Sequence, residues 1–393
     1  MKEQLALTNI QVYTENEVIE NGFIKIKSGE IAEIGCMDIF GNDPRYEKIE
    51  FPPGNSALPG MIDLHIHGVN GTDMMDATEE ALRNMAISLP REGTTSFLVT
   101  TITQEVKAIE KALRNTAIYM NSQEEGAEIL GVHLEGPFIS KKRAGAQPHQ
   151  YIRKPDLTLF QTWQKIATGA IKVVTLAPEE ENGLELIRYL KENDVVASIG
   201  HSDAYHSDME EAIKAGASHI THLYNGMRGL HHREPGVAGT ALANEDLYVE
   251  MIVDGIHIHP AIVKSTYNAK KAEKIILITD SIRAKGLADG SYDLGGQEVT
   301  VQNGKAVLED GTLAGSILKM DAGVRNMLEF TGCTIEEMIQ MTAGNPAKRL
   351  NVYHRKGSLK VGKDADLIIL DQNNELLMTF CRGKLVYRKG DLE

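Results

Sequence analysis

The chain is poor in several features that mark specialised proteins. Its 393 residues include three cysteines, Cys36, Cys333 and Cys381, which lie far apart and lack CxxC spacing. Reduced thiols in a cytoplasmic protein are the simplest interpretation of that pattern. No apolar run approaches the roughly 20 residues that a membrane span needs, and the first four residues mix charge instead of opening an apolar signal-peptide core. We therefore expect a soluble, cytoplasmic protein with no membrane partner.

An excess of positive charge is also lacking. The chain has 41 Lys and Arg against 55 Asp and Glu, which gives a net charge of −14. It offers no basic stripe, so nucleic acid is not an expected partner. An anionic small substrate remains compatible with this charge, because a local cationic pocket can outweigh the global field. The length allows one large α/β domain together with a smaller one.

Short segments of alternating apolar and polar residues occur near both ends of the chain. Turn signals such as Ser28-Gly29-Glu30 separate them, which is typical of antiparallel strands. The segments are residues 5–12, 22–26 and 31–34 at one end and residues 367–370, 376–380 and 384–387 at the other. We predict one small β-sandwich domain built from residues 1–57 together with residues 350–393.

The middle of the chain alternates apolar, strand-like runs with segments of helical spacing. The candidate strands are residues 61–65, 96–101, 129–135, 171–176, 195–201, 219–223, 248–253 and 274–280. Helical periodicity is clear at residues 79–89, 104–120, 183–191 and 208–215. Such alternation predicts an α/β fold, a (β/α)₈ TIM-like barrel over residues 58–349. A Gly-rich alternation predicts an inserted hairpin near residues 290–312.

Acidic and imidazole side chains stand where five of these apolar runs end. They are His65, His67, Glu135, His201, His222 and Asp280. In a parallel barrel the C-terminal ends of the strands converge at one mouth, which is where such barrels place their chemistry. His, Glu and Asp are the ligand types of a hydrolytic divalent-metal site.

Each of these side chains also has a structural interpretation. The His65 and His67 pair alone would equally suit buried histidines that only form hydrogen bonds, and Asp280 would suit a helix N-cap. Glu135 is harder to explain in this way, because a buried carboxylate without a cation costs several kcal/mol. Taken together, the strand ends favour a metal site. A carboxylate such as Asp280 beside it can accept a proton from water and pass it to a leaving amine.

Motifs along the whole chain resemble the amidohydrolase superfamily of metal-dependent hydrolases. They lie at residues 59–68, 133–138, 200–203, 222–227, 233–236, 254–257, 313–316 and 357–370. The Glu135-Gly136-Pro137 strand end is specific among them, because many members of the superfamily use a modified lysine as a metal ligand. The resemblance implies hydrolysis of the acetamido group of N-acetylglucosamine 6-phosphate to glucosamine 6-phosphate and acetate.

The resemblance also implies roles for the residues at the strand ends. Glu135, His201 and His222 would hold the principal metal, and Asp280 would be the catalytic acid and base. The pair His65 and His67, which some relatives lack, would hold a second ion. The implied cofactor is one or two divalent ions per subunit, Zn in the first place, with Fe, Mn or Co as alternatives that such ligands also accept.

The same resemblance assigns the sugar phosphate to three positions. Asn225, the backbone of Gly226 and Arg233 would bind it, and Arg suits bidentate recognition of phosphate. In the family this Arg can be donated by a neighbouring subunit, so a homodimer is implied. A surface salt bridge is the alternative role for Arg233, and His231 and His232 beside it are interpreted as loop residues.

The sugar and its acetamido end would meet His257 and a turn. The turn consists of Leu313, Ala314, Gly315 and Ser316. Ala146 and Gln147 are also expected at the substrate, where some relatives have a histidine. Gln147 donates a hydrogen bond but cannot carry a proton, and His149 would replace it only in a different loop register. Alternatively, His257 would not touch the substrate itself but would support the residues that do.

Two other functions compete with this one. The first is a dihydroorotase-like or hydantoinase-like hydrolase of cyclic amides, and Glu135 together with the Asn225 and Arg233 pattern argues against it. The second is a catalytically inactive relative that acts as a binding or structural protein. Such a protein would be expected to have lost metal ligands or Asp280, whereas this chain keeps all of them.

Overall fold

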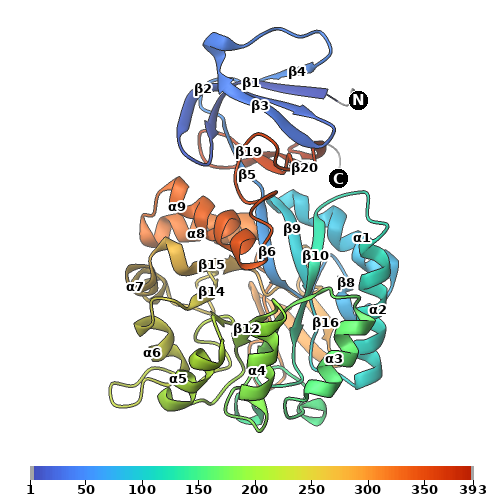
Figure 1. The fold of residues 1–393 in the computed structure, drawn as a ribbon, viewed down its shortest axis with the longest axis vertical. Coiled ribbons are helices and arrows are strands. Elements are labelled where there is room, and N and C mark those ends of the chain that lie inside the picture. Colours follow the sequence, from blue (N-terminus) through green and yellow to red (C-terminus); the bar gives the residue numbers. More distant parts are fainter. Residues whose placement is uncertain (1–3, 391–393) are drawn as a thin grey trace.

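The structure, a computed structural model, describes residues 4–390. The sequence-based expectations about a signal peptide and about the terminal domain extend to residues 1–3 and 391–393, which lie outside the described residues. Figure 1 shows a barrel ringed by helices and, above it, a smaller sheet region to which both ends of the chain contribute.

Eight parallel strands form the barrel predicted for the middle of the chain. In spatial order they are β6 Met61–Ile66, β9 Thr94–Thr100, β10 Glu128–Glu135, β11 Ile171–Leu176, β12 Val196–Ile199, β13 His219–Ile220, β14 Tyr248–Ile252 and β15 Ile275–Ile278. The end of β15 returns to β6, where the Asp280 N–H donates to the His65 carbonyl at 2.8 Å. The predicted TIM-like fold is thereby confirmed.

Helices cover the outside of the barrel (Figure 1). They are α1 Glu79–Ser88, α2 Val106–Met120, α3 Leu157–Ile166, α4 Gly183–Glu192, α5 His206–Ala215, α6 Gly236–Ala243, α7 Pro260–Lys270, α8 Met320–Thr331, α9 Ile335–Ile339 and α10 Asn345–Arg349. The side chains of Thr78 and Asp156 cap α1 and α3 by accepting backbone N–H groups. Apolar residues at helical spacing, such as Leu186 and Leu190 in α4, are buried against the strands. Within residues 4–390 no helix is both long and apolar enough to cross a membrane.

Strands from both ends of the chain pair in one sheet, which confirms the small β-sandwich. They are β1 Gln4–Tyr13, β2 Val18–Lys27, β3 Glu30–Cys36, β4 Glu47–Glu50, β5 Ser56–Pro59, β19 Leu367–Leu370, β20 Leu376–Cys381 and β21 Lys384–Arg388. The two ends meet where β5 pairs antiparallel with β19, with Pro59 opposite Leu367. Leu7, Ile24 and Phe380 are fully buried in the core of this domain. Its strand β5 ends directly before β6 begins.

Buried ion pairs connect the terminal sheet to the barrel. The Lys356 Nζ is buried and lies 2.8 Å from Glu128 at the start of β10 and 3.0 Å from Asp364. It also contacts Asp366, and Arg355 pairs with Glu128 at 2.5 Å. Arg382 also lies 3.7 Å from Glu128, so three cations face three carboxylates, which limits the penalty for burying them.

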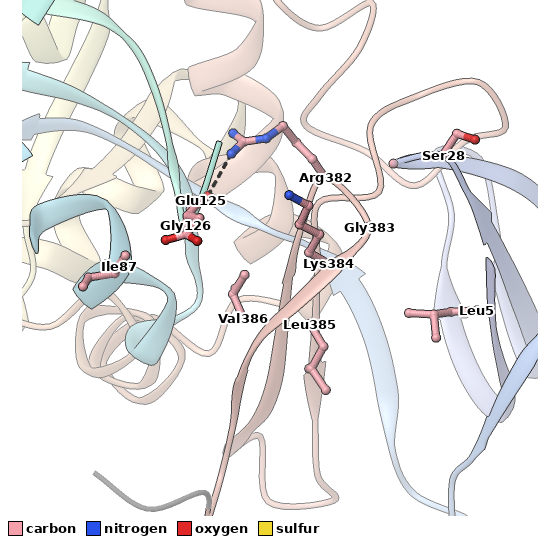
Figure 2. Close-up of a pocket in the computed structure, with 11 residues that line it drawn as sticks. Leu5, Ser28, Ile87, Glu125, Gly126, Arg382, Gly383, Lys384, Leu385 and Val386 are labelled. Carbon is pink, nitrogen blue, oxygen red and sulfur yellow. Dashed lines mark hydrogen bonds between the residues drawn. The ribbon is translucent and has the colours of Figure 1, made fainter. Parts of the chain in front are cut away.

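A cleft of about 730 Å³ lies between the terminal sheet and the barrel (Figure 2). Arg382 reaches the Gly126 carbonyl at 3.3 Å there, and Lys384 and Ile87 also line the cleft. Gly126 precedes β10, so this cleft lies at the opposite end of the barrel from the mouth, where Glu135 ends the same strand.

Three antiparallel strands follow β15 where the sequence predicts a hairpin, and the third strand extends it. They are β16 Gly290–Leu294, β17 Gln297–Gln302 and β18 Lys305–Val307. The Gln297 Nε2 donates to the Ala146 carbonyl at 2.6 Å, and Leu294 shares an apolar cluster with Ile102. The insertion therefore packs over one side of the mouth. A short hairpin of β7 Gly68–Val69 and β8 Thr72–Asp73 follows β6.

Candidate metal centre and active site

Six side chains of the types that bind metals meet at the mouth of the barrel. They are His65, His67, Glu135, His201, His222 and Asp280, and all are buried. His201, His222 and Asp280 each lie two residues past a strand and have left-handed backbone, with φ of 47°, 26° and 48°. Residues with side chains seldom adopt this conformation, and such strain clusters at functional sites.

The first group of ligand atoms surrounds one oxygen of Glu135. The Oε1 atom lies 3.1 Å from His222 Nε2 and 3.3 Å from His201 Nε2. The two imidazole nitrogens are 3.2 Å apart. The three residues expected to hold the principal metal are thus brought together with one potential ligand atom each.

The second group surrounds one oxygen of Asp280. The Oδ1 atom lies 3.2 Å from His67 Nε2 and 3.5 Å from His65 Nε2. Glu135 connects the two groups, because its Oε2 is 3.3 Å from His67 Nε2 and its Oε1 is 3.5 Å from His65 Nε2. The geometry fits two neighbouring cations that share Glu135.

The hydrogen-bond roles of the histidines also fit a cation. The His201 Nδ1 lies 2.9 Å from the Arg143 carbonyl, which only accepts, so Nδ1 carries the proton and Nε2 presents a lone pair toward Glu135. The buried His65 Nε2 and Asp280 Oδ1 have no hydrogen-bond partner among residues 4–390. Lone pairs and carboxylate oxygens that face one another are satisfied by a divalent ion between them.

The acid–base properties of the cluster lead to the same conclusion. Burial disfavours a charged His67, yet the carboxylates of Asp280 and Glu135 raise its pKa to about 10. Burial also disfavours a charged Glu135, but the facing histidines His65, His201 and His222 hold its pKa well below its ordinary value. The cluster therefore attracts positive charge, as protons or as metal, and metal binding is expected to release protons.

A cavity of about 210 Å³ opens onto these groups. Besides five of the six residues it is lined by Ile102, Gly145, Ala146, Gln147, Asn225, Gly226, His257, Leu294, Thr312, Leu313 and Gly315. The sequence-predicted substrate residues Ala146, Gln147, Asn225, Gly226, His257, Leu313 and Gly315 are thus gathered in one wall.

Gln147 has both ends of its amide engaged. Its Nε2 donates to Glu135 Oε2 at 2.8 Å, and its Oε1 accepts from the Thr103 N–H at 2.8 Å. The second contact fixes which end of the amide faces Glu135. Gln147 therefore orients a candidate ligand in addition to lining the cavity, whereas His149 is exposed in a short turn, His149–Tyr151.

Gly226 lets the backbone approach the metal ligands closely. Its φ is +57°, and an added Cβ would lie 2.7 Å from His201 Nδ1. Its neighbour Asn225 donates to the His222 carbonyl at 3.3 Å, which closes the turn that carries His222. His257 is oriented by Asp254, whose Oδ2 is 2.6 Å from its Nδ1.

Three of the sequence-predicted substrate residues, Arg233, Ala314 and Ser316, are not part of the cavity lining. Arg233 is exposed, and its guanidinium lies 2.7 Å from His232 Nε2. The Ser316 hydroxyl donates to the Thr279 carbonyl at 2.5 Å, and Ala314 is buried in the apolar cluster beneath the insertion. Ser316 positions Asp280, because its N–H donates to the Asp280 carbonyl at 2.8 Å, while Leu313 and Gly315 of the same turn line the cavity.

Glu250, His133 and Asp254 support the site, but the sequence analysis gave none of them a role, although His133 and Asp254 lie in two of its motifs. Glu250 is fully buried in β14 and contacts His65 and His219 at 3.1 Å each. His133 is held between the Leu64 carbonyl and Thr175, at 3.1 and 2.7 Å. The signal that could have identified Glu250 is a single acidic residue inside an apolar strand.

Comparisons with known proteins agree with this site. Residues 56–386 match the amidohydrolase family model. The N-acetylglucosamine-6-phosphate deacetylase of Bacillus subtilis (strain 168) is 52% identical over 390 residues, which are 98% of each chain. The crystal structure of N-acetylglucosamine-6-phosphate deacetylase from Thermotoga maritima superposes with a TM-score of 0.88 at 35% identity, over 98% of this chain and 100% of that one.

A fourth comparison includes a ligand. A point mutant of the Mycobacterium smegmatis N-acetyl-D-glucosamine-6-phosphate deacetylase, solved in complex with N-acetyl-D-glucosamine-6-phosphate, has a TM-score of 0.90 at 29% identity, over 98% of this chain and 99% of that one. The family match covers most of the chain, and so does the similarity to the Bacillus subtilis enzyme. The chain belongs to the amidohydrolase family.

Proposed function

We propose that this chain hydrolyses the acetamido group of N-acetyl-D-glucosamine 6-phosphate to D-glucosamine 6-phosphate and acetate, a step of amino-sugar catabolism. One observation carries the proposal: His201 and His222 lie within 3.3 Å of Glu135 Oε1, while Asp280 Oδ1 lies 3.2 Å from His67 in the same buried cluster. The similarity to the Bacillus subtilis enzyme supports the substrate.

Glu135, His201 and His222 would hold the principal ion, and His65 and His67 a second one, with zinc as the first candidate. When bound, such an ion lowers the pKa of a coordinated water toward about 7 and polarises a carbonyl oxygen. Asp280 is the acid and base. Burial raises its pKa, but the facing His65 and His67 outweigh this and lower it in the metal-free protein. A bound cation would supply positive charge in their place, so the carboxylate would be ionised and able to take a proton from water. An amine leaves readily only when protonated, and the same carboxyl delivers that proton to the nitrogen.

The phosphate site of one subunit is completed by another. Among the described residues, the cavity lining includes no lysine or arginine, although the substrate carries a phosphate. Asn225 and the Gly226 backbone supply neutral contacts, and Arg233 of the partner subunit supplies the charge in a homodimer. His257 and Leu313 contact the sugar. The three cysteines are free thiols, which supports a cytoplasmic setting.

Acetate release tests the proposal directly. The purified, metal-containing protein should release acetate from N-acetylglucosamine 6-phosphate far faster than from unphosphorylated N-acetylglucosamine. Two further compounds serve as comparison substrates: N-acetylgalactosamine 6-phosphate, which is the 4-epimer of the proposed substrate, and dihydroorotate. Faster turnover of either one would replace the proposed substrate, and no acetate release from any of the sugars would reject deacetylation.

A further inference from the structure

We propose that Glu250 is a positioning residue that directs both groups of metal ligands, through the side chain of His65 and through the backbone of His222. The inference rests on the metal centre of the proposed function, and it adds a residue that makes no contact with the substrate cavity. Glu250 lies in β14, and its side chain is completely buried.

Three N–H groups converge on the Glu250 carboxylate. Its Oε2 lies 3.1 Å from His65 Nδ1 and 3.2 Å from the His222 backbone nitrogen. Its Oε1 lies 3.1 Å from His219 Nε2. An ionised carboxylate only accepts hydrogen bonds, so each of the three nitrogens must donate.

The first consequence concerns the tautomer of His65. With the proton held on Nδ1 by Glu250, the lone pair of Nε2 points toward Glu135 Oε1 and Asp280 Oδ1, each 3.5 Å away. A histidine binds a metal through such a lone pair, and an acceptor on its other nitrogen fixes the ring orientation. Without this acceptor the proton is free to move to Nε2, where it blocks coordination.

The second consequence concerns the turn that carries His222. This residue has φ +26°, a conformation that a side chain makes unfavourable. Its N–H is bound by the Glu250 side chain, and the next N–H, of Leu223, is bound by the Glu250 carbonyl at 2.9 Å. One residue thus anchors two successive amides of the turn that aims His222 at Glu135.

Replacement by glutamine isolates this role from packing. The Glu250→Gln change keeps the size of the side chain but offers one acceptor oxygen, and its NH₂ group must face at least one of the three donors. Loss of such supporting contacts typically weakens metal binding by 10- to 100-fold. We expect weakening in that range, strongest for the ion held by His65.

The test uses the full chain loaded with Co²⁺ as the probe. Elemental analysis gives the stoichiometry, competition with a chelator gives the affinities, and visible absorption reports the Co²⁺ coordination geometry. The matched control is Glu92→Gln, which changes another buried glutamate, one that pairs with Lys285 at 2.7 Å. This control should keep the Co²⁺ affinities and the spectrum of the parent protein.

Glu250→Asp is the second variant, because it retains the charge and shortens the reach, and it should give an intermediate loss of Co²⁺ affinity with an altered spectrum. A folded Glu250→Gln protein that binds Co²⁺ with the affinities and spectrum of the parent would overturn the inference. If Glu250→Gln does not fold, a Glu250→Asp protein with the Co²⁺ affinities and spectrum of the parent would overturn it. These readouts need no substrate. A parent protein that binds Co²⁺ but releases no acetate would reject the proposed function and leave the role of Glu250 to be decided by the Co²⁺ data.

Discussion

At the scale of single residues, Glu135 and Asp280 are both buried carboxylates, but their surroundings differ. Glu135 is enclosed by imidazoles on both oxygens and by the Gln147 amide. Asp280 faces histidines through Oδ1 and has no hydrogen-bond partner there among the described residues. Glu135 is therefore suited to hold a cation with both oxygens, whereas the Asp280 carboxylate has an oxygen that can face a cation and still exchange a proton with water.

Asp280→Asn should separate chemistry from binding. Asparagine tolerates the left-handed backbone at this position, but it cannot act as a base. We expect kcat to fall by roughly 10²-fold or more, while substrate and the principal metal still bind. Steady-state kinetics and elemental analysis check this together. Near-normal kcat, or loss of the principal metal, would show that Asp280 has another role.

His65 and His67 decide the number of ions. Replacing both, by His65→Gln and His67→Asn, should reduce the metal content to about one ion per chain and leave measurable activity, since Asp280 and the principal group remain. Elemental analysis of the parent and the double variant measures this. Anomalous scattering from a single position in the metal-replete parent would contradict it.

At this scale the sequence predicts the site residues that end apolar runs. It predicts few of the residues that orient those side chains by hydrogen bonds. Glu135 and His201 could be identified because a polar side chain after a buried strand must emerge at the barrel mouth. Glu250 lies inside its strand, and the alternation of side chains does not reveal that it faces His65 from a neighbouring strand. The contact of Gln147 with Glu135 depends on the path of a loop, which no periodicity encodes.

At the scale of elements, all eight barrel strands lie where apolar runs predict them, but some end earlier. The run at residues 219–223 gives a strand that stops at Ile220, because His222 turns left-handed. Likewise β12 stops at Ile199, before His201. The apolar pattern predicts which residues are buried. It does not predict the backbone conformation of a functional residue in the run, because the contacts of that residue determine the conformation.

The loop after β13 offers a matched pair of glycines that tests this coupling. Gly226→Ala places a methyl group 2.7 Å from His201 Nδ1 at a left-handed position, whereas Gly229→Ala meets no atom within 4 Å. We expect Gly226→Ala to weaken the principal metal and lower kcat/KM by about tenfold or more, because a small misplacement of a ligand is costly. Gly229→Ala should behave like the parent. Equal effects of the two changes on metal affinity would mean that the close approach at Gly226 is unimportant.

At the scale of the whole molecule, Glu128 connects the barrel to the terminal sheet. Burial raises its pKa, but contacts with Arg355 and Lys356 outweigh this and hold the pKa at about 2, below the ordinary 4.5. A carboxyl with a lowered folded-state pKa stabilises the fold above pH 4.5, and this contribution is lost as the pH falls from there toward 2. The shift corresponds to a contribution on the order of 3 kcal/mol.

Glu128→Gln should therefore lower the melting temperature at pH 7 and reduce the further loss between pH 7 and pH ~3. Calorimetry at several pH values measures both. The control is Glu125→Gln, since Glu125 is exposed and pairs only with the exposed Arg83 at 3.3 Å among the described residues. An unchanged pH dependence in Glu128→Gln would show that this network does not set the acid stability of the protein.

The way in which subunits assemble is the property that the sequence of one chain predicts least, and Arg233 is an example. It lies in an exposed loop outside its own cavity wall, so its proposed role depends on a second subunit. Arg233→Ala should raise KM for the phosphorylated sugar by about tenfold to over a hundredfold, the effect of losing a charge-assisted contact of roughly 1.5–3 kcal/mol. Turnover of unphosphorylated N-acetylglucosamine should change little.

Mixed dimers reveal which subunit supplies the arginine. A hybrid of an Arg233→Ala subunit and an Asp280→Asn subunit contains one site with both residues intact, provided that Arg233 acts across the interface. Such hybrids, purified with two different affinity tags and assayed well below the KM of the variants, should regain about half the activity of the parent dimer, while each homodimeric variant stays impaired. If Arg233 acted within its own subunit, both sites of the hybrid would be defective and no activity would return. The hybrid assay therefore distinguishes a shared active site from one completed within a single chain.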